Sequence, residues 1–156
     1  AAVSGGPFTE FLKNKGYDFE LIVIGNGGLL NQLQETVKSL ELENNIEFYG
    51  YVTNPYPVIK SSDIFLSTSL SEGFPTVIVE SLFFGVPVVT TPVGGAEELI
   101  KTGINGIISG FSAESFCESI IKIISSKLDK VGIQKTISNL AIENWIKNIE
   151  ERILIS

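Results

Sequence analysis

The chain has no histidine and only one cysteine, Cys117, among its 156 residues. Without histidine, neither a Cys–His nor a Ser–His nucleophilic dyad can form, and a histidine-based zinc site is excluded as well. A single cysteine cannot make an internal disulfide, which fits a reducing compartment. Because Cys117 lies beside Phe116 and near Ile120 on an apolar helical stripe, we expect it to pack rather than to react.

Basic residues and aspartates are also scarce. Eleven Lys and Arg residues stand against 18 Asp and Glu, giving a net charge of −7 and a pI near 4.6, so no basic patch can meet a nucleic acid. Asp18, Asp63 and Asp129 are far apart, so the Asp-x-Asp pair of many metal-dependent sugar transferases is absent. Glu80 and the glycines and prolines interrupt the longest apolar run before it reaches membrane-spanning length. The amino end lacks the basic and apolar regions of a signal peptide.

Short apolar runs alternate with helical patterns along the whole chain. The expected strands cover residues 19–24, 46–49, 63–67, 87–90 and 106–108. The expected helices cover residues 7–15, 29–40, 55–60, 75–84 and 96–101. The carboxyl-terminal third is expected to be helical, with two apolar stripes, formed by Phe116, Ile120, Ile123 and Ile124 and by Ile142, Ile146, Ile149 and Ile153. This alternation predicts a single α/β domain, a Rossmann-like parallel sheet with helices on both faces, which binds ligands beyond the carboxyl ends of its strands.

Residues 71–80 are the most informative segment. Glu72 lies in a glycine turn, and Glu80 lies among Val, Ile, Leu and Phe side chains on the helix that Pro75 is expected to begin. A charge among apolar neighbours is costly unless it is paired or faces a ligand. Thr76 shares one helix face with Glu80, and the free N–H groups at the helix start favour a phosphate. Glu80 itself suits two neighbouring hydroxyls, such as those of a ribose.

Other interpretations of these residues stay open at this point. Glu72 is also explained as a solvated turn carboxylate, and Glu80 as a surface residue or half of a structural ion pair. Residues 25–28 form a lone Gly-x-Gly, with Leu30 in place of the third glycine of a dinucleotide fingerprint, which disfavours NAD. Glycines at the predicted strand ends serve either tight turns or close approach to a ligand.

Five motifs in order resemble the carboxyl-terminal, nucleotide-sugar-binding domain of GT-B glycosyltransferases of the group 1 (family four) type. Residues 21–27 are similar to the family's second strand and Gly-Asp-Gly turn, with Asn26 in place of Asp. Residues 46–52 resemble its next strand and base-contacting loop, and Glu72 with Glu80 match its Glu-x7-Glu signature. Residues 91–98 resemble the Gly-Gly-x-x-Glu segment, and residues 102–106 the Gly-x-Asn-Gly turn.

The resemblance implies a role for each matching position. The site would consist of a catalytic Glu72 and the donor-binding residues Gly27, Val52, Gly73, Phe74, Thr76, Val77 and Glu80. Glu80 would hold the ribose hydroxyls, Glu72 the donor sugar, and the amides of Thr76 and Val77 the diphosphate. Further candidates from the flanking turns are Asn26, Gly94, Gly95 and Glu98. For Glu98, an interaction with the helix dipole is an equal alternative.

The resemblance also implies a reaction: retaining, metal-independent transfer of a hexose from a nucleotide-diphosphate sugar, with no cofactor. We expect the reaction to serve cell-surface polysaccharide or glycolipid synthesis. The full-length protein is expected in the cytoplasm, peripherally associated with the inner membrane face. The family has a first strand with an Arg and a Lys that have no match here. Residues 1–156 are therefore expected to be an inactive donor-binding fragment lacking an amino-terminal acceptor-binding domain. A non-catalytic nucleotide-binding or interaction module and a nucleotide-sugar epimerase are the alternatives.

Overall fold

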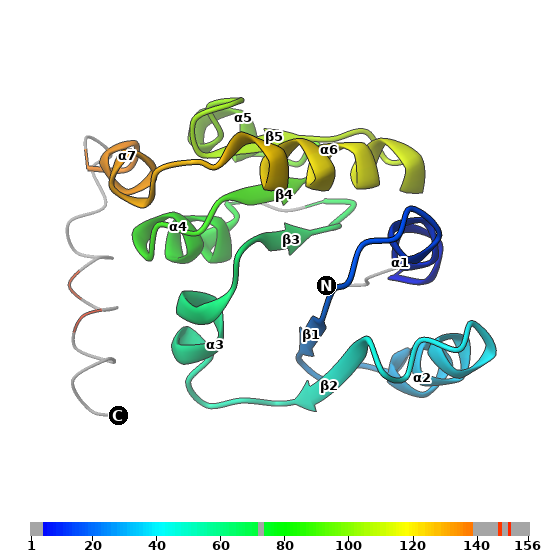
Figure 1. Cartoon of the computed structure of the whole chain (residues 1–156). Coiled ribbons are helices and arrows are strands. Elements are labelled where there is room, and N and C mark those ends of the chain that lie inside the picture. Colours follow the sequence, from blue (N-terminus) through cyan, green and yellow to red (C-terminus); the bar gives the residue numbers. More distant parts are fainter. Residues whose placement is uncertain (1–4, 72–73, 139–146, 148–149, 151–156) are drawn as a thin grey trace.

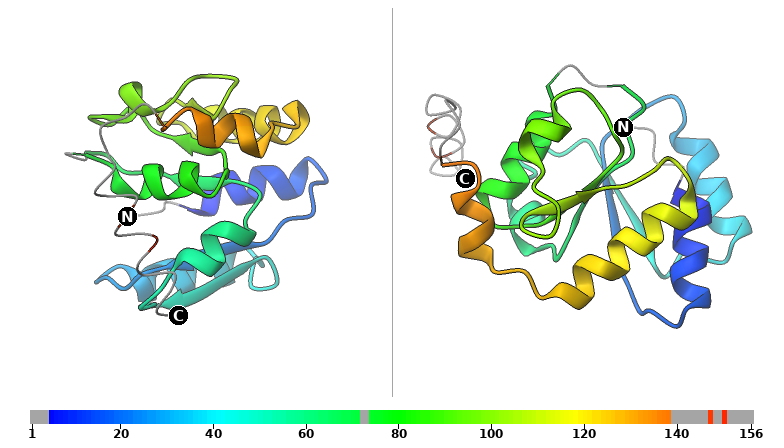
Figure 2. Two further views of the ribbon diagram at one scale, coloured as in Figure 1. Left: turned by 90° about the vertical axis from the view of Figure 1, so that its left-hand side faces the viewer. Right: turned by 90° about the horizontal axis from the view of Figure 1, so that it is seen from above.

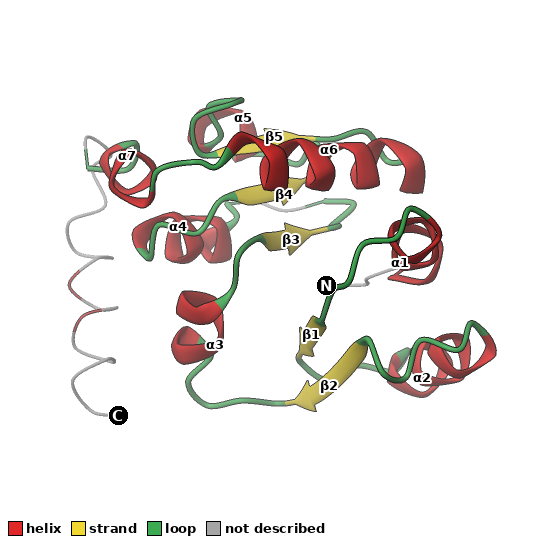
Figure 3. Ribbon diagram, in the orientation of Figure 1, coloured by secondary structure: helices red, strands yellow, loops and turns green. Residues whose placement is uncertain are grey.

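The computed structural model describes residues 5–71, 74–138, 147 and 150 (Figure 1). Helices and strands alternate as predicted (Figure 3). The strands are β1 (Leu21–Ile24), β2 (Ile46–Gly50), β3 (Phe65–Ser67), β4 (Val88–Thr90) and β5 (Gly106–Ile108). The helices are α1 (Gly5–Asn14), α2 (Leu30–Ser39), α3 (Tyr56–Ser61), α4 (Thr76–Phe83), α5 (Ala96–Leu99), α6 (Ala113–Ser126) and α7 (Lys130–Lys135).

All strand pairs are parallel, which confirms the predicted α/β class, but they form two sheets instead of one. β1 pairs with β2, with Leu21 opposite Ile46, and β3, β4 and β5 form a second sheet in that order. In Figure 1 the strands follow one another from bottom to top as β2, β1, β3, β4 and β5, so the interruption lies between β1 and β3. No strand in the described part of the chain bridges it.

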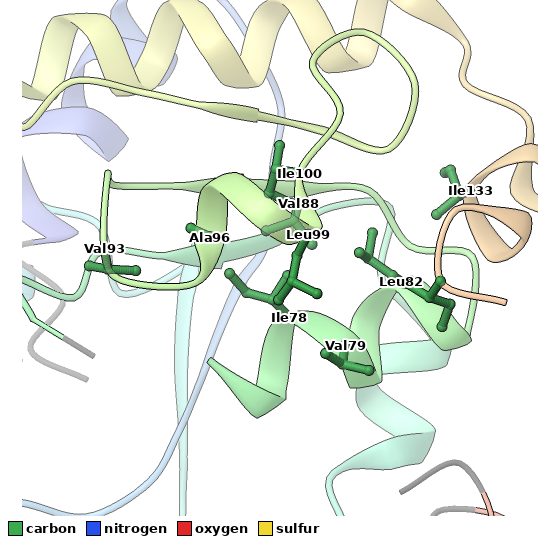
Figure 4. Close-up of a cluster of buried hydrophobic side chains, with 10 residues drawn as sticks. Ile78, Val79, Leu82, Val88, Val93, Ala96, Leu99, Ile100 and Ile133 are labelled. Atoms are coloured by element: carbon green, nitrogen blue, oxygen red, sulfur yellow. The ribbon is translucent and has the colours of Figure 1, made fainter. Parts of the chain in front are cut away.

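Helices cover both faces of the three-stranded sheet. Neighbouring strand residues point to opposite faces, so Val88 of β4 packs with α4, α5 and α7, whereas Val89 packs with α1 and α6. Figure 4 shows the first of these clusters, with side chains of α4 and α5 gathered around Val88. The helices α1 and α6 lie side by side on the other face (Figure 2). Their cluster also includes Leu21 of β1 and Leu66 of β3, so it holds the two sheets together.

Several boundaries and one stripe differ from the sequence predictions. Strand β1 begins at Leu21 instead of residue 19, because the Phe19 carbonyl accepts a hydrogen bond from the Asn45 side chain at 3.0 Å. Ile124 was expected in the core but is 48% exposed, since it lies at the edge of the buried face of α6. The predicted stripe from Ile142 to Ile153 lies outside the described residues.

Helix α7 lies in the carboxyl-terminal third, which was predicted to be helical, but its bounds were not predicted, because Ile133 is its one buried residue and no apolar stripe marks it. Its start is capped by Asp129, whose Oδ2 accepts the Gly132 N–H at 2.8 Å. The helix passes close to Gly85, which follows α4 with φ of +72°, and a Cβ at this position would lie 2.9 Å from the Lys130 carbonyl oxygen. Only glycine tolerates both the backbone angle and this approach. In the described part of the chain, no helix has the length and apolar character needed to cross a membrane.

A fully buried asparagine, Asn105, connects α5, β5 and α7. Its Oδ1 accepts the Lys101 N–H at 2.7 Å, and its Nδ2 donates to the Leu99 carbonyl at 2.9 Å and to Thr136 Oγ1 at 2.8 Å. The side chain thus satisfies three groups that no helix or strand ladder reaches. This is the physical role of the asparagine in the turn of residues 102–106.

Replacing Asn105 with Ala is expected to lower the free energy of unfolding by about 2–4 kcal/mol, because buried polar groups lose their partners and a cavity forms. The measurement is urea unfolding of the longest natural polypeptide that contains these residues. Asn31→Ala on exposed α2 is the matched control and should change the free energy by less than about 0.5 kcal/mol. Equal effects of the two substitutions would contradict the role given to Asn105.

Candidate functional site

The carboxyl ends of β1 and β2 are joined beyond their regular ladder. The Gly25 N–H donates to the Gly50 carbonyl at 2.7 Å, and both glycines have positive φ, +130° and +66°. A Cβ on Gly50 would lie 3.4 Å from Asn26 Oδ1, so the turn after β1 and the end of β2 are in contact. At these two positions the turn itself requires glycine.

Gly27, a predicted binding residue, is different. Its φ lies outside the positive region, and a Cβ built there would meet no atom within 4 Å. Gly27 is exposed, as is Asn26, and its carbonyl accepts the Leu30 N–H at 3.0 Å where α2 begins. Neither the backbone conformation nor internal packing requires glycine at this position.

The loop after β3 is anchored to β4 before it reaches the Glu72 turn. The Thr91 N–H donates to the Ser67 carbonyl at 3.0 Å, and the buried Thr91 hydroxyl donates to the Ser69 carbonyl. Beyond Ser69 the chain becomes exposed, with Leu70 81% and Phe74 49% accessible. The predicted residues Glu72 and Gly73 follow in this loop and lie outside the described residues.

The start of α4 corrects three predictions. Pro75 precedes the helix as its N-cap, and the helix begins one residue later, at Thr76. The Thr76 N–H, expected to be free for a diphosphate, donates to the Phe74 carbonyl at 3.0 Å. Val77, expected to be buried, is 41% exposed. The N–H of Val77 lies in the first turn of the helix, where N–H groups lack intrahelical partners.

Glu80 lies one turn into α4, half-buried. Ile78, Val79 and Leu82 around it are fully buried, which fixes the orientation of the helix. Glu80 Oε1 accepts a hydrogen bond from the hydroxyl of Tyr56 at 3.3 Å. Sequence reasoning missed Tyr56, because no spacing rule relates residues on two separate helices. Its aromatic ring in a short predicted helix was the only signal.

The segment after β2 leads directly to Tyr56. Val52, predicted to contact a base, is half-buried in this segment. The Asn54 Oδ1 accepts the Tyr56 N–H at 3.1 Å, where α3 begins. The bond between Tyr56 and Glu80 therefore connects the segment after β2 with the helix after β3, across the interruption between the two sheets.

The turn after β4 holds the remaining candidates. Gly95 has φ of +76° as the N-cap residue of α5, so the backbone explains this glycine. Gly94 is exposed, and Glu98 is exposed in the first turn of the same helix. Both interpretations of Glu98 remain open. Within the described residues, no three His, Cys, Asp or Glu side chains form a group that would hold a metal ion.

Comparison with known proteins gives a family match. Residues 8–141 match the family model described as Glycosyl transferases group 1. An uncharacterized glycosyltransferase of Methanocaldococcus jannaschii is 40% identical over 87 residues, which are 55% of this chain and 21% of that protein. A PP-undecaprenol alpha-1,4-N-acetyl-D-galactosaminyltransferase of Campylobacter jejuni is 28% identical over 152 residues, covering 89% of this chain and 41% of that protein.

The fold is shared with solved structures. Anabaena HepE in complex with UDP superposes with a TM-score of 0.75 at 23% identity, over 97% of this chain and 44% of HepE. At this identity the likeness shows the fold alone. The chain spans less than half the length of HepE and of the two curated relatives.

Cys117 does not belong to the site. It is fully buried on α6 among Leu12, Val89, Phe116 and Ile120. Burial disfavours the charged thiolate and raises the pKa of the thiol from 9.0 to about 11. Since the thiolate is the nucleophile, the structure agrees with the predicted packing role.

Alkylation of Cys117 by iodoacetamide at about pH 8 is expected to be at least about 100-fold slower in the native protein than in concentrated urea. A pKa of about 11 leaves roughly one thiol in a thousand ionised at this pH, against about one in ten at the ordinary value. The rate should rise with pH until the folded pKa is passed. Equal rates in the native and unfolded protein would contradict the assignment.

Proposed function

This chain belongs to the group 1 glycosyltransferase family, and from that premise we propose that it is the donor-binding half of a retaining, metal-independent enzyme. The enzyme would move a hexose from a nucleotide-diphosphate sugar to an acceptor. The observation that carries the proposal is the half-buried Glu80 on α4, at the carboxyl end of β3, eight residues after Glu72. A carboxylate in this position can accept hydrogen bonds from two neighbouring ribose hydroxyls.

Residues at the carboxyl ends of the strands support separate subsites for the ribose, the base and the phosphates. We assign the ribose to Glu80 and the base to the backbone around Val52. The open space beside Gly27 suits the close approach of a phosphate. At the start of α4 the Val77 N–H, rather than the Thr76 N–H, is the donor that suits the diphosphate, because the Thr76 N–H is used by Phe74.

The sugar would lie against Glu72 and the amides of Gly73 and Phe74. In a retaining transfer, the bond from the anomeric carbon to the diphosphate breaks, and the acceptor oxygen bonds to the same face of that carbon. The leaving phosphate oxygen takes the proton of the acceptor hydroxyl. Donors in the site stabilise the charge that develops on the phosphate.

The interruption between the two sheets supports a larger enzyme. Leu21 and Gly25 direct their N–H groups to β2, so the alternate residues Ile22 and Ile24 present their backbone groups to the opposite edge. All four residues of β1 are apolar, as in strands covered on both faces, yet each is only half-buried. We propose that a further parallel strand lies between β1 and β3 and that an acceptor-binding domain precedes it.

The acceptor and location of the whole enzyme are part of the same proposal. The Campylobacter jejuni relative is named for a PP-undecaprenol-linked glycan. By analogy, we propose a lipid-linked glycan or polysaccharide as acceptor, with the enzyme in the cytoplasm and peripherally associated with the inner membrane face.

Glu80→Ala and Glu72→Ala, each made in the longest natural polypeptide, are expected to reduce kcat/KM for the nucleotide sugar at least about 100-fold, since each change removes charge-assisted hydrogen bonds of roughly 1.5–3 kcal/mol. Transfer of radiolabelled hexose to lipid extracts measures the loss. Circular dichroism should show an intact fold.

Glu118→Gln on the exposed side of α6 is the control and should keep full activity. Full activity in both test variants would place the transferase site elsewhere. Conversion of the sugar nucleotide without an added acceptor would favour the epimerase alternative.

Gly27→Ala is expected to weaken UDP binding about tenfold or more without lowering the unfolding temperature, because the methyl group fits the fold but occupies the space of the phosphates. Calorimetric titration and thermal unfolding measure the two effects. Gly106→Ala is the contrasting control: its Cβ would lie 2.3 Å from the Val88 carbonyl oxygen, so it should destabilise the β4–β5 pairing. Unchanged UDP affinity in Gly27→Ala would remove this residue from the site.

A further inference from the structure

The phenol of Tyr56 is held firmly beside Glu80. Tyr56 is 3% exposed, and its ring packs against Phe84 with a centroid distance of 5.6 Å and an interplanar angle of 46°. Phe84 lies four residues after Glu80, on the same face of the α4 segment. The ring therefore rests on one turn while its hydroxyl reaches the carboxylate one turn earlier, at 3.3 Å.

The backbone around Tyr56 adds to this rigidity. Pro55 is the N-cap of α3, and Pro57 lies in its first turn, so both neighbours of Tyr56 have a restricted φ. The Tyr56 N–H is held by the Asn54 side chain at 3.1 Å. Tyr56 and Ile59 also form a small buried cluster with Phe83 and Phe84. The hydroxyl thus has a defined position before any ligand binds.

A defined donor matters because a glutamate carboxylate is otherwise poorly oriented. Its terminal torsion is broad and has no sharp minimum. A carboxylate accepts about four hydrogen bonds, and the phenol occupies one position on Oε1. A fixed donor on one carboxylate oxygen fixes the plane of the carboxylate. The two adjacent ribose hydroxyls can donate to the carboxylate together only when its plane is oriented correctly. The distance of 3.3 Å is long for such a bond, and contacts of this kind shorten when a substrate binds.

We propose that Tyr56 is a positioning residue that orients the Glu80 carboxylate for the adjacent hydroxyls of a ribose. This inference rests on the proposed function, since it needs a ribose at Glu80. It also links two parts of the site: Tyr56 begins the helix after Val52, so the segment assigned to the base and the carboxylate assigned to the ribose share one hydrogen bond.

The test compares UDP with 2'-deoxy-UDP by calorimetry, in the longest natural polypeptide that contains the chain, with GDP and ADP pairs used if UDP does not bind. The native protein is expected to prefer the ribonucleotide at least about tenfold. Tyr56→Phe keeps the ring against Phe84 but removes the hydroxyl, and should reduce this preference to about threefold or less. A merely structural role would weaken both ligands equally and leave the ratio unchanged.

Tyr17→Phe is the matched control, since Tyr17 packs with the α1–α6 cluster on the other face, and it should retain the native ratio. Glu80→Ala should lose the preference entirely, and adding Tyr56→Phe to it should change UDP affinity by less than about twofold. A native ratio in Tyr56→Phe, together with a lost ratio in Glu80→Ala, overturns the positioning role alone. A native ratio in Glu80→Ala, or no nucleotide binding by the native protein, overturns the proposed function.

A second pair of variants covers the case in which Tyr56→Phe fails to fold. Glu80→Gln removes the charge but keeps an oxygen that the phenol can hold, so it should retain part of the preference for UDP. The double variant Tyr56→Phe with Glu80→Gln removes the carboxylate charge and the phenol hydroxyl together, and it should have a lower ratio than Glu80→Gln alone. Equal ratios in these two proteins also overturn the inference.

Discussion

The structure depends on one constraint: a carboxylate lies on a helix whose neighbouring apolar side chains are fixed in the core. Ile78, Val79 and Leu82 are fully buried, so α4 cannot rotate to expose the half-buried Glu80 fully to water. Burying a side chain of this size contributes roughly 1.5–3 kcal/mol, and three together outweigh the preference of one carboxylate for full solvation. The Tyr56 hydroxyl supplies part of the hydrogen bonding that the half-buried carboxylate needs. The same arrangement presents a charged acceptor, half-buried and oriented, at the carboxyl end of the sheet.

The glycines near the site, within the described residues, are explained by different physical reasons. Gly25, Gly50 and Gly95 have positive φ and are required by turns. Gly106 is required by packing, because its Cβ would enter the Val88 carbonyl. Gly27 and its neighbour Gly28 are required by neither. Because the fold does not need glycine there, next to the start of a helix, we propose a bound ligand as the reason. The sequence alone does not distinguish these reasons, since all of these glycines lie at or near the ends of predicted strands or helices.

Much of the architecture was predictable from the sequence, and the exceptions have local causes. All five strands and the order of the first six helices follow from apolar runs separated by glycine and proline, because these patterns reflect local backbone preferences. Strand β1 starts late because the Asn45 side chain takes the Phe19 carbonyl. The bounds of helix α7 were not predicted, because its stability comes from Ile133 buried against α4 and not from a periodic pattern. The Thr76 N–H was misjudged because the turn at Phe74 depends on how the loop after β3 is anchored.

The sequence by itself determined the α/β class and the family, together with the identity of Glu80 as the acidic residue of an apolar helix. These properties depend on residue type and spacing, which are local. Only the tertiary structure decided what surrounds that residue: Tyr56, which lies 24 positions earlier in the chain, and the interruption of the sheet between β1 and β3. Both involve groups that are distant in sequence, and a hydrogen bond between such groups depends on how the intervening elements pack. The apolar pattern of one segment therefore does not predict which residue of another segment lies beside it.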